Sequence, residues 1–305
     1  LSSIVWDVDP ILIHFGDGGI RWYGLFWAIG LYVCWKVNEL IYKKENCPAE
    51  WPDLLFFWMA AGVIIGARLG HCLFYEWHQY GKPWYLFGWE FTYRNPYIEN
   101  PLRLLKIWEG GLASHGGAIG LIIAAILLNK FKFGKYPQFG TSWIWILDRL
   151  CIGVCFTAML IRLGNLMNSE IYGGPTDLPW GFIFVNGDSY RDVPCHPTQI
   201  YEILYCFVAL CVTGPMYLYT EARRREGLLL GVFLEIVFVT RFCLEFIKND
   251  QEAFEANHLL NMGQWLSIPF IILGIYLIIR AYRRPLSPVV EKRPQSLDPK
   301  YRDVK

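Results

Sequence analysis

The sequence of 305 residues has little charge for its length, and its charges are nearly balanced. Lysine, arginine, aspartate and glutamate together make up 18% of the residues, and the formal net charge is +1. Soluble domains are closer to about 25% charged. We expect no nucleic-acid partner, because binding one requires a basic excess that neutralises phosphates.

Sequence patterns that bind metals are also lacking. The nine cysteines are scattered, and none is spaced as CxxC or combined with histidine in the manner of a metal site. Most of them lie inside apolar stretches, where a free cysteine usually behaves as a small hydrophobic residue. We therefore expect no metal and no other cofactor.

Apolar residues are abundant and are gathered into separate stretches. They make up 54% of the chain, and the mean hydropathy is +0.27. Seven stretches have about the length needed to cross a bilayer core of about 30 Å, where helix satisfies the backbone without water. They are residues 22–41, 54–75, 113–128, 143–160, 200–219, 228–247 and 263–279. The predicted fold is all-α, a polytopic membrane protein with about seven transmembrane helices.

Basic residues in the loops predict the orientation. They cluster after the first, third, fifth and seventh stretches, which lie on one side if there are seven spans. That side is predicted to be the cytoplasm, with the N-terminus outside and the C-terminus inside. The opposite loops are longer and also carry some basic residues.

We predict one membrane domain, residues 1–284, with two outer segments. Residues 76–112 are dense in aromatic side chains and suit the headgroup layer. Residues 162–197 are expected to form a small folded cap, and residues 285–305 a disordered tail. Gly62, Gly66 and Gly70 lie on one helical face, which favours close helix packing.

A charged side chain inside a membrane span costs about 3 kcal/mol or more, so each needs a reason. Four polar clusters stand out. In the first, His115 opens the third stretch, and Gly116 and Gly117 leave space for a lipid headgroup. The alternative is an interfacial histidine at a glycine-rich helix start.

The second cluster directly follows the fourth stretch. Arg162 is a natural partner for a lipid phosphate, and Asn165, Asn168 and Glu170 add polar groups within two turns. The alternative is a polar knot that only caps the helix.

The third and fourth clusters contain glutamates in apolar surroundings. Glu202 follows His196 and needs a cation or a proton; the alternative is one buried salt bridge at a helix start. Arg241 and Glu245 are four residues apart and share a helical face, so they could simply pair. Six residues converge toward the outer leaflet and predict an outward-facing site for an anionic, lipid-like substrate. They are His115, Arg162, Glu170, Glu202, Arg241 and Glu245.

Together, these clusters and three further segments resemble the motifs of prolipoprotein diacylglyceryl transferases, in that family's order. The segments are Trp22-Tyr23-Gly24, Gly66-Ala67-Arg68-Leu69-Gly70, His115-Gly116-Gly117, Arg162-x-Gly164-Asn165-x-x-Asn168-x-Glu170, His196-Pro197-x-Gln199-x-Tyr201-Glu202, Arg241-Phe242-x-x-Glu245 and Met262-Gly263-Gln264. The match runs from about residue 22 to 279. Two positions depart from it: Ile161 and Ser169 stand where glycine is usual or common.

The resemblance implies an enzyme of the bacterial inner membrane, with a periplasmic N-terminus, a cytoplasmic C-terminus and a site on the periplasmic side. Its partners would be phosphatidylglycerol, the lipobox cysteine of a prolipoprotein signal peptide, and membrane lipids. The cysteine sulfur would attack the glycerol carbon bonded to the phosphate. A thioether would form and glycerol phosphate would leave.

The resemblance also suggests roles for individual residues. Arg162 would hold the phosphate with Asn165, and Arg241, set by Glu245 or Glu202, would stabilise the leaving group or the thiolate. His115 is the candidate base, because an ordinary histidine pKa suits proton transfer at neutral pH. The alternative is that His115 only forms a hydrogen bond with the lipid headgroup. The remaining expected substrate contacts are Tyr23, Arg68, Gly116, Gly117, Asn168, Glu170 and Gly173.

Three other classes remain open at this point. A transporter or flippase for an anionic lipid would also bury arginines and glutamates, but the sequence has no inverted repeat and its charges gather at one face. Another phospholipid-consuming transferase and a non-catalytic scaffold are the remaining two. Consumption of phosphatidylglycerol tied to a cysteine acceptor distinguishes the transferase from all three.

Overall fold

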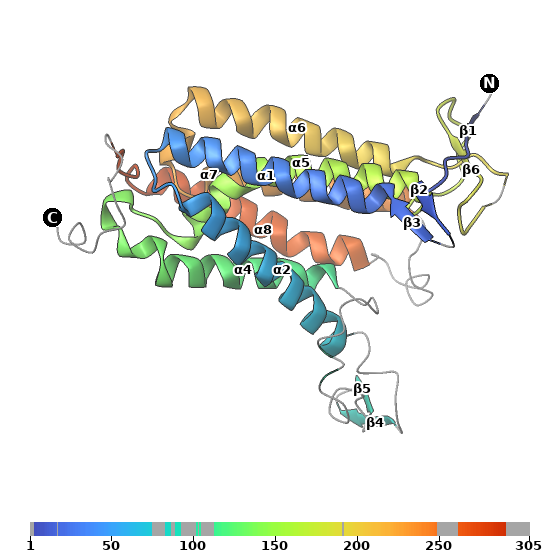
Figure 1. Ribbon diagram of the computed structural model, residues 1–305, viewed down its shortest axis with the longest axis horizontal. Coiled ribbons are helices and arrows are strands. Elements are labelled where there is room, and N and C mark those ends of the chain that lie inside the picture. Colours follow the sequence, from blue (N-terminus) through green and yellow to red (C-terminus); the bar gives the residue numbers. More distant parts are fainter. Residues whose placement is uncertain are drawn as a thin grey trace. The chain divides into compact units, whose positions relative to one another are not determined.

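The computed structural model describes residues 3–16, 18–74, 83–86, 89–92, 102, 104, 113–190, 192–248 and 262–290. This part of the chain is mostly helical (Figure 1). Its long helices are α1 (Trp22–Lys44), α2 (Trp51–Phe74), α4 (Ser114–Phe131), α5 (Trp143–Met167), α6 (Thr198–Tyr219), α7 (Leu228–Leu244) and α8 (Met262–Arg283). Each overlaps one of the seven apolar stretches, so the all-α prediction is confirmed.

Five of these helices are long and apolar enough to cross a membrane by length and composition, namely α2, α4, α5, α6 and α8. Helix α7 has only 17 residues, and α1 carries a Lys36–Glu39 ion pair at 2.8 Å within its apolar run. The chain is therefore a multi-pass membrane protein. A total of seven spans stays a prediction.

The chain gathers into two compact units. The first contains Leu1–Glu45 and Leu147–Glu291, and the second contains Asn46–Ile146 together with Lys292–Lys305. The single membrane domain expected over residues 1–284 stays a prediction. Of the expected outer segment 76–112, the structure describes an antiparallel hairpin, β4 (Pro83–Leu86) with β5 (Trp89–Thr92), and residues 102 and 104. The expected tail is described only to residue 290.

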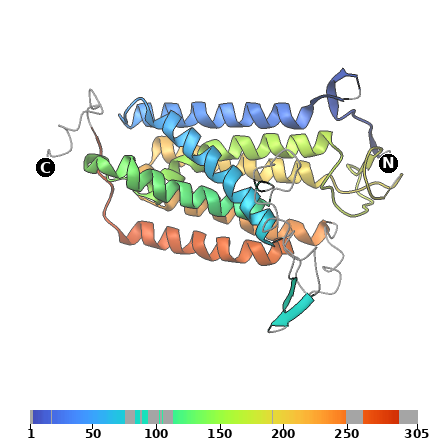
Figure 2. The same cartoon turned by 60° about the horizontal axis from the view of Figure 1, so that its bottom comes forward.

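In the first unit, α7 packs against both α6 and α8, and two small sheets lie at the end where α1 and α6 begin (Figures 1 and 2). Strand β1 (Ile4–Trp6) pairs in parallel with β6 (Phe182–Phe184), and β2 (Ile11–Phe15) pairs with β3 (Gly18–Arg21) in an antiparallel hairpin. The N-terminal segment is thereby joined to the segment between α5 and α6.

A small core joins the segment between α5 and α6 to the last turn of α5. It is built from Leu166, Tyr172, Phe182, Phe184 and Cys195. Residues 168–197 are called the cap below. Trp6 packs against the cap core and donates a 2.9 Å hydrogen bond from its indole to the carbonyl of Leu166. Helix α5 ends at Met167 rather than near residue 160, so the cap begins later than residue 162.

At the opposite end of the first unit, two buried charges connect the helices. Asp148 accepts hydrogen bonds from the backbone N–H groups of Gly227 (2.6 Å) and Leu230 (2.8 Å), which caps the start of α7. Arg149 pairs with Glu45 at 3.1 Å and lies 3.8 Å from Asp148. Although Asp148 and Arg149 are neighbours in the sequence, each reaches mainly to another element.

In the second unit, α2 and α4 pack along each other through glycines (Figure 2). A Cβ on Gly62 would lie 2.7 Å from the carbonyl oxygen of Gly120, and one on Gly70 would lie 2.7 Å from the Cα of Gly116. No side chain fits at these distances. The packing role predicted for Gly62, Gly66 and Gly70 is therefore confirmed.

Candidate functional site

Five ionisable side chains form a continuous series in the first unit, here called the charge chain: Arg162, Glu202, Lys248, Glu245 and Arg241. The Nε atom of Arg162 pairs with Oε2 of Glu202. The Nζ atom of Lys248 lies 2.6 Å from Oε1 of Glu202 and 3.4 Å from Oε1 of Glu245. The Nε atom of Arg241 lies 3.5 Å from that same Glu245 oxygen. Positive and negative groups thus alternate from α5 through α6 to the end of α7.

Burial is unequal along the charge chain. The side chains of Glu202, Lys248 and Glu245 are 1%, 3% and 6% exposed, whereas those of Arg162 and Arg241 are 20% and 32% exposed. A buried charge is tolerated only when it is closely paired, and the three inner groups are. The two arginines are the members of the charge chain that an incoming anion can reach.

The turn after α5 extends the polar network from Arg162. Its Nη1 donates to Oδ1 of Asn165 at 3.1 Å. The side-chain amides of Asn165 and Asn168 both donate to Oε1 of Glu170, at 2.7 and 3.2 Å. Ser169 has a left-handed φ of 52°, which explains why glycine suits this position. Asn165 therefore connects the partly exposed Arg162 guanidinium to the Glu170 carboxylate, which accepts hydrogen bonds from both asparagines.

Three glycines let other elements approach this network. A Cβ on Gly164 would lie 2.8 Å from the ring of Tyr23, so α1 and α5 meet there. One on Gly173 would lie 2.8 Å from side-chain atoms of both His196 and Thr198. One on Gly263 would lie 2.5 Å from the carboxylate of Glu245. Gly173, expected to contact substrate, is thus accounted for by packing.

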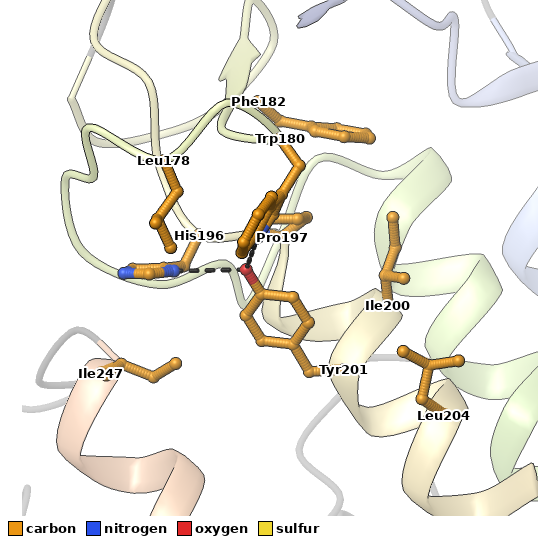
Figure 3. Close-up of a pocket in the computed structure, with 9 residues that line it drawn as sticks. All are labelled: Leu178, Trp180, Phe182, His196, Pro197, Ile200, Tyr201, Leu204 and Ile247. Carbon is orange, nitrogen blue, oxygen red and sulfur yellow. Dashed lines mark hydrogen bonds between the residues drawn. The ribbon is translucent and has the colours of Figure 1, made fainter. Parts of the chain in front are cut away.

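An apolar pocket of about 610 Å³ lies beside the start of α6 (Figure 3). The hydroxyl of Tyr201 accepts a 2.8 Å hydrogen bond from the indole of Trp180 and lies 3.3 Å from Nδ1 of His196. Burial lowers the pKa of His196, which favours a neutral ring. Ile200, Tyr201 and Leu204 line the pocket, whereas Glu202 is not among its lining residues and joins the charge chain instead.

The structure places most residues expected from the sequence in one unit. The first unit contains a set that includes both arginines and the carboxylates: Tyr23, Arg162, Asn165, Asn168, Glu170, Gly173, Glu202, Arg241 and Glu245. The second unit contains Arg68, His115, Gly116 and Gly117.

In the second unit, the expected residues are buried or only partly described. The backbone of His115 lies in the first turn of α4, but its side chain is outside the described residues. Gly116 and Gly117 are buried against α2 and leave no open surface for a headgroup. Arg68 is 5% exposed and donates to the carbonyl of Leu104 at 3.2 Å.

Lys248 was missed by sequence reasoning. It falls at the edge of the sixth apolar stretch, three residues after Glu245, and that spacing was the available signal. Its closer partner, Glu202, is 46 positions earlier in the chain, and no local pattern reveals such a contact.

Comparisons with known proteins agree with the family resemblance that the motifs predict. A family model described as prolipoprotein diacylglyceryl transferase matches residues 10–280. A phosphatidylglycerol–prolipoprotein diacylglyceryl transferase of Porphyromonas gingivalis is 44% identical, covering 94% of this chain and 97% of that protein. Proteins of the same name from Tolumonas auensis and Bacteroides fragilis are 40% and 38% identical. Each match covers 90% of this chain, and 96% and 94% of those proteins respectively.

Proposed function

Because the chain belongs to the prolipoprotein diacylglyceryl transferase family, we propose that it performs the first step of lipoprotein maturation. It transfers the diacylglyceryl group of phosphatidylglycerol to the lipobox cysteine of a prolipoprotein. A carbon–sulfur bond forms, the bond between the glycerol carbon and the phosphate oxygen breaks, and the thiol proton is released. The products are a thioether and glycerol phosphate.

The charge chain is the observation that supports this reaction. Its two ends, Arg162 and Arg241, are guanidinium groups that remain partly exposed, while Glu202 and Glu245 behind them are buried. The departing phosphate gains a negative charge as its bond to carbon breaks. Preorganised cations placed where that charge develops lower the barrier to the reaction.

The acceptor thiol imposes a second requirement. A free cysteine has a pKa of about 8.5, so a base or a cationic environment must favour the thiolate. We assign the cationic environment to Arg241, which Glu245 orients at 3.5 Å. His115 stays the candidate base, because histidine is the residue type whose ordinary pKa suits proton transfer at neutral pH.

We place the site on the periplasmic side of the bacterial inner membrane, with the N-terminus periplasmic and the C-terminus cytoplasmic. In the first unit, basic residues gather at the end opposite the cap, where α1 and α8 finish and α7 begins. They are Lys43, Lys44, Arg223, Arg224, Arg225, Arg280, Arg283 and Arg284. Basic clusters favour the cytoplasmic face, so the cap and the charge chain face the periplasm.

The test uses purified protein in phosphatidylglycerol vesicles with a peptide that contains a lipobox cysteine. Release of glycerol phosphate and the mass of the peptide are followed together, with a Cys→Ser peptide as the control. Release that requires the cysteine, with a matching gain of diacylglyceryl mass, supports the proposal. Folded protein that releases nothing contradicts it and favours a transporter.

A further inference from the structure

Resting on the proposed function, we propose that Lys248 is a positioning residue that leaves Arg162 and Arg241 available to the substrate phosphate. Lys248 acts through the two glutamates of the charge chain and does not touch the substrate. Its side chain is only 3% exposed and lies between two carboxylates, so an incoming lipid meets the arginines instead.

The backbone fixes where this lysine points. Lys248 follows the short helix η6 (Glu245–Ile247), and it forms an isolated antiparallel bridge with Gly173 of the cap. Next to it, the N–H of Gly174 donates to the carbonyl of Ile247 at 3.0 Å. The cap thus holds the main chain at Lys248 while the ammonium group is held against Glu202 and Glu245. Two anchors of this kind leave the side chain little freedom.

The balance of charge gives the lysine its effect. The charge chain has three cations and two carboxylates, which leaves one positive charge over. Glu170, held by two asparagines next to Arg162, brings the local sum to zero. Without Lys248 the same set is net negative, which disfavours an anionic lipid. Within the charge chain, Glu202 would then pair with Arg162 alone and Glu245 with Arg241 alone.

A comparison of three variants separates a charge effect from simple loss of structure. Lys248→Met keeps the length of the side chain and removes the charge, and Lys248→Arg keeps the charge. We expect Lys248→Met to lower kcat/KM for phosphatidylglycerol by about 30-fold or more, because a buried pair is broken. The KM for the peptide stays within about twofold, and Lys248→Arg recovers most of the activity.

The third variant combines Lys248→Met with Glu245→Gln. Glu245→Gln alone lowers activity, because Arg241 loses the carboxylate that orients it. In the Lys248→Met background the same change restores the balance of charge, so activity rises above that of Lys248→Met. Lys36→Met is the matched control. It removes a half-exposed lysine from a short ion pair in α1 and leaves turnover near the wild-type value.

A second measurement does not depend on turnover. Phosphatidylglycerol raises the melting temperature of the wild type and of Lys248→Arg more than phosphatidylethanolamine does, and Lys248→Met loses that difference. The proposal is overturned if phosphatidylglycerol stabilises the wild type no more than phosphatidylethanolamine does. It is also overturned if Lys248→Met keeps the larger stabilisation by phosphatidylglycerol. A folded Lys248→Met protein with wild-type kcat/KM, or a double variant no better than Lys248→Met, overturns it as well. A wild type that binds phosphatidylglycerol selectively but releases no glycerol phosphate refutes the proposed reaction alone.

Discussion

Replacing Arg162 by lysine keeps the positive charge but removes the planar guanidinium. Arg162 pairs with Glu202 through Nε and donates to Asn165 through Nη1 at 3.1 Å. It therefore serves two partners and still presents an edge to the phosphate. An ammonium group has no such fork. Losing two charge-assisted hydrogen bonds costs about 3–4 kcal/mol at about 1.5–2 kcal/mol each, which corresponds to a roughly 100- to 1000-fold lower rate.

The assay is release of glycerol phosphate per folded protein at saturating peptide, over a range of phosphatidylglycerol concentrations. Arg280 lies in the last turn of α8, which finishes at the end of the first unit opposite the cap (Figure 1). Because Arg280 also serves two acceptors, both on Glu226, Arg280→Lys is the matched control. It should keep turnover within about twofold of the wild type. An Arg162→Lys protein with normal turnover and a normal melting temperature would show that bidentate contact is not required.

Three further predictions concern stability. Gly173→Ala places a methyl group 2.8 Å from His196 and costs about 1–3 kcal/mol, so the melting temperature falls; an unchanged value contradicts the packing argument. Asp148→Asn weakens the cap on α7 at Gly227 by about 1–2 kcal/mol, which thermal unfolding detects, while turnover per folded protein is kept. Burial lowers the pKa of His196, so as the pH falls this ring is protonated in the unfolded chain before it is protonated in the folded protein. This contribution to stability is therefore present above about pH 6.5 and is lost as pH falls through the folded pKa. Melting temperatures of the wild type and of His196→Gln should converge from pH 7.5 to 5.0, and parallel curves would show that His196 is not the source.

The helices were predictable from the sequence because apolar length alone identifies them, but their ends were not. Helix α5 continues to Met167 through Arg162 and Asn165, where hydropathy falls. The helix continues because Glu202 and Glu170 provide partners for these side chains, and both lie beyond the helix in the sequence. A hydropathy scale scores residues one at a time and cannot detect such pairing.

The candidate site was likewise predictable in part from the sequence, whereas the contacts that join its residues were not. Arg162, Glu202, Arg241 and Glu245 were expected because charges are costly inside or beside apolar stretches, and the structure brings them together. The spacing of Lys248 from Glu245 was a local signal for one ion pair, but its closer contact with Glu202 is tertiary and has no local pattern.

Glu235 also had no explanation from the sequence alone. Its carboxylate lies against α8 at Gly274, where a Cβ would be 3.2 Å from Glu235 Cδ. The glycine on the facing helix provides the space that this side chain needs.

The order of the charge chain along the sequence has a consequence for how the protein enters the membrane during synthesis. The charges emerge from the ribosome as plus at 162, minus at 202, plus at 241, minus at 245 and plus at 248. Within this set, the running sum of nascent charge never exceeds one. Glu202 on α6 supplies the counter-ion for Arg162 on α5, so we expect these two helices to be able to bury this pair before Arg241, Glu245 and Lys248 are made.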